Sequence, residues 1–319
     1  MRILVIFLFL VSFVACSKKE NKKIDVSNIG IETNVIRFDQ IFYTTPPEKL
    51  GELKTEFPYL FPQANPDSVW VNKMKNKDEL ELFAETEKVY NDFTEEIKQL
   101  TELFKHIKYY YPKFKEPKVI TLLSNVDYDS KVVLADSLLF ISLDVFLGAD
   151  SPIYQTHPNY IKQNNTKEHL IVAVAEQFAE QIIPPTNDKS FVSKIVQEGK
   201  KLALIQAFLP DVTPQEIIGY SADQYEWAEK SEAEIWKYFI QKEYLYSSDH
   251  QLTKRFIEDA PFSKFFLEVD KDSPGRIGTW FGWRIVDSYL RHNGAGIKEG
   301  TVTDNEEIFK RSKYKPKKQ

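Results

Sequence analysis

The chain has 319 residues and is poor in cysteine and in long apolar runs. Cys16 is its only cysteine, so no intrachain disulfide can form and stability must come from burial. The apolar run before Cys16 holds about a dozen residues, whereas a transmembrane helix needs about twenty. A Gly-x-Gly-x-x-Gly dinucleotide fingerprint is also missing. The sequence therefore indicates neither a disulfide-stabilised domain, nor a membrane-spanning protein, nor a dinucleotide-binding protein.

The N-terminal leader has the layout of a secretory signal, with Arg2, an apolar run and the small residue Ala15. Because Cys16 follows directly, residues 13–16 (FVAC) resemble the lipobox of a bacterial lipoprotein signal. We expect residues 1–15 to be a signal peptide, Cys16 to be lipidated, and residues 16–28 to form a flexible tether. The alternative is an ordinary cleaved signal followed by an incidental cysteine.

The composition is that of a packed globular protein, with 42% hydrophobic and 28% charged residues. The formal charge of −5 includes a basic C-terminal tail, residues 310–318, so the folded body is more acidic than the total. An acidic body argues against nucleic-acid binding, which favours a basic face. The tail could contact anionic lipid, but a terminal charge run is more often simply solvated.

Hydrophobic periodicity predicts a mostly helical α+β fold with a small sheet. We expect strands at 33–39 and 118–123, and a third segment, 132–143, that folds back around Asp136. Residues 78–111 have a helical pattern, and nearly all of 168–292 reads as helix interrupted by prolines. The prediction is one domain over 29–319, with an N-terminal helical part at 29–115, a sheet at 116–145, and a helical half ending in a bundle at 146–319.

One predicted helix, residues 167–183, has a pattern that is typical of a degenerate zincin. In zincins, a His-Glu-x-x-His helix supplies two zinc ligands and a glutamate that activates water. Here Glu176 occupies the glutamate position, but alanines, Ala175 and Ala179, occupy both histidine positions. His169 and Glu180 lie on the same stripe as Glu176, because seven residues nearly complete two turns.

The next helix carries Glu198 before a glycine, where several zincin families place their third ligand. Catalytic zinc needs three protein ligands, and alanine offers no donor atom. We therefore predict no catalytic residues, no metal and no cofactor, with Glu176 and Glu198 as relic candidates. The alternative is that both are ordinary surface glutamates on helices.

A segment rich in glycine and tryptophan, residues 273–289, indicates either a docking surface or tight helix packing. Gly278 and Gly282 are one turn apart and would let a second helix approach the backbone closely. The candidate partner-binding residues in this segment are Arg276, Trp280 and Trp283.

An acidic helical segment lies between residues 220 and 236. Glu226, Glu229 and Glu232 are spaced three apart and could bind a cation or a basic partner. A solvated helix face is the commoner explanation of such a run.

Several stretches together resemble the gliding motility lipoprotein GldB family of the Bacteroidetes. They are the lipobox, 142–154 (SLDVFLGADSPIY), 198–201 (EGKK), 217–220 (IIGY), 232–236 (EAEIW) and 273–283 (SPGRIGTWFGW). The resemblance covers essentially the whole mature chain. It implies a lipid-anchored envelope protein required for gliding, a process tied to type IX secretion. It also implies kinship with predicted zinc peptidases that have lost their metal ligands.

These observations favour a non-enzymatic component of the gliding or secretion machinery, anchored by Cys16 and facing the periplasm. Other gliding-machinery proteins are then its expected partners. Two other functions stay open. One is a zinc-dependent hydrolase that uses Glu176 as base and Glu198 as ligand, with help from His169, His157 or Asp144. The other is a periplasmic module that binds peptides or cell-wall fragments.

Overall fold

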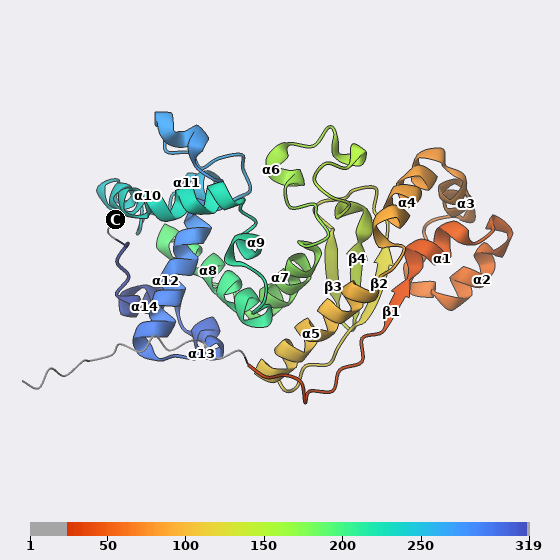
Figure 1. Ribbon diagram of the computed structural model, residues 1–319, viewed down its shortest axis with the longest axis horizontal. Helices are drawn as coiled ribbons and strands as arrows, with labels where there is room; N and C mark the ends of the chain where they lie inside the picture. The colour runs from red at the N-terminus through yellow and green to blue at the C-terminus, as the bar shows by residue number, and fades with distance from the viewer. Residues whose placement is uncertain (1–23, 318–319) are drawn as a thin grey trace, which may run out of the picture.

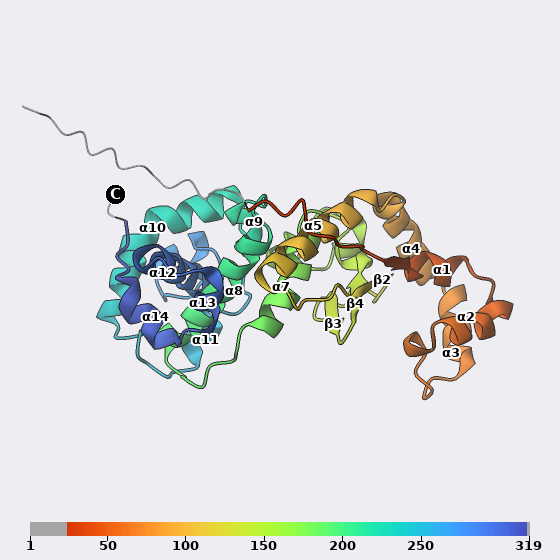
Figure 2. The same ribbon diagram turned by 90° about the horizontal axis from the view of Figure 1, so that it is seen from below.

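The structure, a computed structural model, describes residues 24–317. A four-stranded sheet lies in the middle of an elongated molecule, with α1–α4 at one end and α8–α14 at the other (Figures 1 and 2). The strand order is β1-β2-β4-β3; β1 and β4 run parallel to β2, and β3 runs antiparallel to β4. The strands are β1 (Val35–Arg37), β2 (Lys118–Leu122), β3 (Val132–Ala135) and β4 (Leu138–Ser142).

The third predicted strand segment does fold back on itself, as β3 and β4. The two strands pair with Ala135 opposite Leu138, so Asp136 and Ser137 form the turn between them. Asp136 has a φ of 51°, a left-handed conformation that aspartate adopts more readily than most residues. The predicted hairpin is therefore confirmed at its expected turn.

The helices at the N-terminal end pack into a small core of their own. Phe38, Phe42, Phe57 and Phe61 are buried there, and Ile120 of β2 joins this core to the sheet. Phe38 contacts Phe57 in an edge-on arrangement, with ring centroids 5.4 Å apart. The helices of this core are α1 (Phe38–Thr44), α2 (Leu50–Glu56) and α3 (Asp67–Lys75). The next helix at this end, α4 (Lys77–Tyr90), buries Leu82 and Tyr90 in the main core instead.

The long helix predicted over 78–111 is two helices, which corrects the sequence expectation. The first is α4, and the second is α5 (Thr94–Tyr110). The chain breaks between them because the Asp92 side chain accepts hydrogen bonds from the Thr94 backbone N–H at 2.9 Å and from its hydroxyl at 2.6 Å. Such local bonds compete with helical ones and start a new helix. Periodicity alone does not reveal the break, because both helices bury apolar faces.

The remaining helices form the larger half of the protein and share one continuous apolar core with the sheet. The predominance of helix with one small sheet confirms the mostly helical α+β class. These helices are α6 (Asn159–Lys162), α7 (Leu170–Ile182), α8 (Phe191–Phe208), α9 (Pro214–Ile218), α10 (Ala222–Gln241), α11 (Gln251–Phe256), α12 (Ile277–Asn293), α13 (Ile297–Val302) and α14 (Asn305–Ser312).

Helices α8 and α12 cross at glycines, where their backbones touch. A Cβ atom added at Gly282 would lie 1.6 Å from the carbonyl oxygen of Ile195, and one at Gly199 would lie 2.1 Å from the carbonyl carbon of Gly282. Both distances are far below van der Waals contact, so only glycine fits at either position. Both glycines predicted to permit close packing do so, since a Cβ at Gly278 would lie 2.8 Å from the carbonyl oxygen of Phe256 in α11. The crossing at Gly282 fixes α8 against the start of α12.

Candidate functional site

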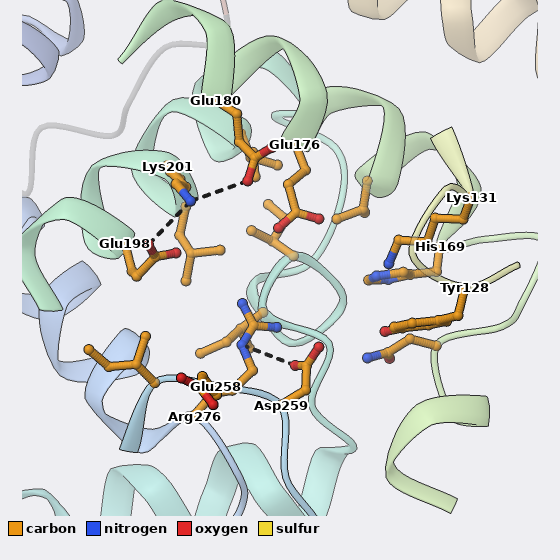
Figure 3. Close-up of a pocket in the computed structure, with 17 residues that line it drawn as sticks. Tyr128, Lys131, His169, Glu176, Glu180, Glu198, Lys201, Glu258, Asp259 and Arg276 are labelled. Atoms are coloured by element: carbon orange, nitrogen blue, oxygen red, sulfur yellow. Dashed lines mark hydrogen bonds and ion pairs between the residues drawn. The ribbon is translucent and has the colours of Figure 1, made fainter. Parts of the chain in front are cut away.

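A cleft of about 350 Å³ opens between α7, α8 and the start of α12 (Figure 3). Glu176 and Glu180 enter it from α7, Glu198 and Lys201 from α8, and Arg276 from the residue before α12. Its apolar floor consists of Val172, Leu202, Ile205, Ile217, Ile218 and Ile257. The structure thus brings Glu176, Glu198 and Arg276, three of the residues selected from sequence, to one place.

Helix α7 presents one stripe of residues to the cleft and buries most of its apolar residues in the core. Val172, Glu176 and Glu180 are spaced four apart and line the cleft. Ala175 and Ala179 are fully buried in the apolar core and do not line it. A histidine at either position would therefore enter the core rather than the cleft.

Lys201 holds two of the cleft carboxylates together. Its Nζ lies 3.2 Å from an oxygen of Glu180 and 3.2 Å from an oxygen of Glu198, so it bridges α7 and α8. Burial alone would lower the pKa of the Lys201 ammonium, but the two carboxylates outweigh it and raise that pKa above its usual value. Lys201 therefore stays charged, and its bridge leaves neither carboxylate available as a free base.

Arg276 faces the cleft from the opposite wall, with its guanidinium directed toward Glu176 in Figure 3. Its Nε lies 3.5 Å from Asp259 Oδ1, and its two terminal nitrogens have no hydrogen-bond partner among residues 24–317. Burial disfavours its charge, but Asp259 and Glu176 raise the pKa of Arg276 above its usual value. The planar fork of the guanidinium therefore remains charged and open to the cleft.

Arg276 also has a strained backbone. Its φ of 58° and ψ of 26° place it in the left-handed region, which costs a residue with a Cβ about 1 kcal/mol. Buried hydrogen bonds enforce this conformation on both sides: Tyr220 donates to the carbonyl of Gly275 at 2.6 Å, and the Ile277 N–H donates to the Ser263 hydroxyl at 3.1 Å. Non-glycine residues held in this way often occur at functional sites.

His169 forms a dyad with Glu216 at one edge of the cleft. Its Nδ1 lies 2.9 Å from a carboxylate oxygen of Glu216, and the residue is only 6% exposed. The carboxylate favours a proton on Nδ1, so in the neutral ring Nε2 carries the lone pair. Nε2 has no hydrogen-bond partner within the described part of the chain, and the ring points into the cleft in Figure 3.

Three charged side chains of the cleft, Glu176, Glu258 and Lys131, lack an ionic partner among the described residues. Glu176 is half-buried and makes no hydrogen bond or ion pair there. Lys131 has no carboxylate partner, and its Nζ lies 4.5 Å from the centre of the Tyr128 ring. The cleft therefore offers unpaired charges of both signs on opposite walls.

The residues present do not fit a zinc ion. Within residues 24–317 no group of three or more His, Cys, Asp or Glu side chains could hold a metal. Asp144 and His157, considered from sequence as substitute ligands, do not line the cleft. Asp144 is fully buried and accepts hydrogen bonds from the backbone N–H groups of Ser124 and Val126, and the His157 ring stacks on Tyr154.

The two tryptophans selected as partner-binding candidates belong to the core. Trp280 is fully buried, so of the two alternatives drawn from sequence it is the packing that holds for this candidate, and Trp283 is half-buried against the same apolar core. The reason is the glycine crossing, which draws α12 against α8. Of the three candidates in that segment, only Arg276 lines the cleft.

Of the three spaced glutamates in α10, two lie on the surface and one is buried. Glu226 and Glu229 are exposed on α10, as a solvated face requires. Glu232 is only 2% exposed and accepts a hydrogen bond from the Tyr314 hydroxyl at 2.6 Å. The run is therefore not a three-carboxylate cation site.

Sequence reasoning missed several residues that line or orient the cleft. Lys201 could have been found, because it lies three residues after Glu198 on a helix and such pairs meet. Asp259 and Tyr128 lie in loops far from α7 in sequence, and no periodic pattern marks them. Glu216 was hidden by its place in the first turn of a five-residue helix.

Fold and site together define a mostly helical α+β protein with a charged cleft beside its sheet. A family model described as "Gliding motility protein GldB" matches residues 19–316, nearly the whole chain. The protein belongs to this family of gliding motility proteins. No curated protein and no solved structure gives a significant match. No helix in residues 24–317 combines the length and apolar character needed to cross a membrane.

Proposed function

We propose that this protein is a lipid-anchored component of the gliding machinery that acts by binding a partner in the cleft, not by catalysis. Family membership supports a role in gliding. The observation that carries the rest is a cleft with no set of metal-ligating side chains among the described residues, in which Glu176 and the terminal nitrogens of Arg276 remain free for a partner. A connection to the zincins stays part of this proposal, resting on the position of Glu176 and Glu198.

The zinc content of the purified protein tests whether it can act as a zinc-dependent enzyme. Detergent-extracted protein, equilibrated with one equivalent of zinc and then desalted, is expected to retain less than about a tenth of an equivalent, because three protein ligands are needed. The measurement is elemental analysis of wild type beside Glu176→Gln plus Glu198→Gln. About one zinc per wild-type chain, lost in the double variant, would contradict the proposal.

A hydrolase is the second candidate, and the His169–Glu216 dyad is the observation that favours it. A carboxylate-oriented imidazole can act as a general base. If the protein binds stoichiometric zinc, a zinc-dependent hydrolase replaces our proposal. If it binds none, a metal-independent hydrolase would have to show peptide cleavage that is lost in His169→Ala.

Lipid anchoring is tested at Cys16, which lies outside the described residues. We propose that the mature chain begins there, that its acyl chains hold the body on an envelope membrane, and that the body faces the periplasm. Several chains are needed, because a single one gives only marginal attachment. Cys16→Ser is expected to move the protein from the membrane fraction to the soluble fraction, measured by immunoblot after ultracentrifugation. Retention of the variant in the membrane would show that a partner or the basic tail holds it instead.

A further inference from the structure

The strongest unexplained feature of the cleft is that its free groups carry both charges. Lys201 pairs with both Glu180 and Glu198, whereas Asp259 meets Arg276 only through Nε, at 3.5 Å. The terminal nitrogens of Arg276 and the carboxylate of Glu176 face each other across the cleft without hydrogen-bond partners among the described residues (Figure 3). A half-buried charge without a partner is costly, so both groups favour a ligand that supplies the opposite charges.

Ligands of a single charge fit this arrangement poorly. A simple anion would meet Arg276 but would be repelled by Glu176 and Asp259. A simple cation would meet the free carboxylates of Glu176 and Glu258, but it would be repelled by Arg276 and Lys131 and would leave both of these cations without a partner. A neutral ligand would remove water from all these charges without replacing it.

The remaining groups indicate a peptide. His169 is only 6% exposed, and its free Nε2 can accept an N–H hydrogen bond from a ligand. The apolar floor, which includes Val172, Leu202 and Ile205, can hold an aliphatic side chain. The fork of Arg276 matches a carboxylate in a bidentate manner. The contact of Arg276 Nε with Asp259 Oδ1, at 3.5 Å, orients that fork before a ligand arrives.

We propose that the cleft binds the carboxyl-terminal end of a peptide that carries an amine on an aliphatic side chain. The terminal carboxylate pairs with Arg276, the amine pairs with Glu176, and the aliphatic stem lies on the apolar floor. This inference rests on the proposed function, since it names the chemistry of the partner that the cleft holds.

The test uses one probe that carries both charges and two probes that each lack one of them. They are N-acetyl-alanyl-lysine with a free carboxylate, the same dipeptide as its carboxamide, and N-acetyl-alanyl-norleucine with a free carboxylate. Isothermal titration calorimetry of the detergent-solubilised full-length protein is expected to give the highest affinity for the first probe. Removal of either charge is expected to weaken binding by about tenfold or more, because each removes a charge-assisted pair.

Two variants assign each charge to its residue. Arg276→Gln is expected to lower the affinity for the first probe by about tenfold but to leave the affinity for the carboxamide unchanged. Glu176→Gln is expected to lower the affinity for the first probe but not that for the norleucine probe. Glu226→Gln, on the exposed face of α10, is the matched control and should change nothing. Thermal unfolding of each variant checks that the fold is retained.

The possible results are distinct from those of the zinc test. No saturable binding of the first probe at about 5 mM, a value near the weak end of specific affinities, would overturn the inference. So would equal affinity for all three probes, or binding that neither Arg276→Gln nor Glu176→Gln changes. If the protein binds neither zinc nor the first probe, the proposed function stands and this ligand is ruled out. If it binds stoichiometric zinc, the proposed function itself is ruled out.

Discussion

Gly282→Ala should lower the free energy of unfolding by about 3 kcal/mol or more, because the new methyl group has no space. Its Cβ would lie 1.6 Å from the carbonyl oxygen of Ile195 and 2.4 Å from the carbonyl carbon. These are backbone atoms of α8, so relief requires α8 and α12 to move apart. Since domains are stable by only about 5–15 kcal/mol, the loss is a large share of the total.

The measurement is urea unfolding, followed by tryptophan fluorescence and far-UV circular dichroism. Gly51→Ala is the matched control, because nothing lies within 4 Å of its added Cβ and it sits in helix α2. Alanine there should be neutral or stabilise by up to about 1 kcal/mol. Gly300→Ala gives an intermediate case, since its Cβ would meet only the flexible end of Leu290 at 2.8 Å. A Gly282→Ala protein as stable as the Gly51→Ala protein would contradict the described helix crossing.

The crossing also connects stability to the cleft. Gly199 follows Glu198 directly, and Gly282 lies less than two turns after Arg276. A shift of α8 against α12 therefore changes the separation of the two cleft walls. We expect Gly282→Ala to weaken cleft binding wherever the variant folds at all.

The sequence predicted the parts of the fold that short-range chemistry controls. The turn at Asp136 and the close approach at Gly282 each depend on one residue type with a local conformational or steric reason. The break between α4 and α5 was missed because local hydrogen bonds from Thr94 to the Asp92 side chain outweighed a continuous apolar pattern. The burial of Trp280 was left open, since a glycine-tryptophan segment fits a docking surface and a helix crossing equally well.

The candidate site was predictable only in part, for a similar reason. Glu176 and Glu198 were found because they stand where the zincin pattern places its glutamate and, on the next helix, its third ligand. The cleft itself is completed by Asp259, Tyr128 and the left-handed backbone of Arg276, which tertiary contacts bring together. The sequence also could not reveal that Ala175 and Ala179 face the core, because the rotation of α7 about its axis depends on what packs against it.

Loss of the cleft charges should abolish gliding without loss of the protein. Glu176→Gln plus Glu198→Gln removes two negative charges from the cleft with little change of shape, and the free carboxylate of Glu176 is the group proposed to meet the partner. Lys201 keeps Glu180 as an ion-pair partner, so the bridge between α7 and α8 is weakened but not lost. We therefore expect the double variant to accumulate normally and to fail in function.

The matched control removes the same charge elsewhere. Glu226→Gln plus Glu229→Gln changes two exposed glutamates on α10 that lie outside the cleft. Substitutions on such a solvated face usually alter stability by less than about 0.5 kcal/mol. This protein should restore gliding as fully as wild type does.

The decisive measurement is colony spreading of a deletion strain complemented with these genes, at equal protein levels by immunoblot. If the cleft between α7, α8 and α12 is the surface through which the protein acts in gliding, wild type and the Glu226–Glu229 variant restore spreading. Colonies of the Glu176–Glu198 variant then stay as compact as those of the deletion strain. Full spreading by a stably accumulated Glu176–Glu198 variant, or by the deletion strain itself, would contradict this role of the cleft.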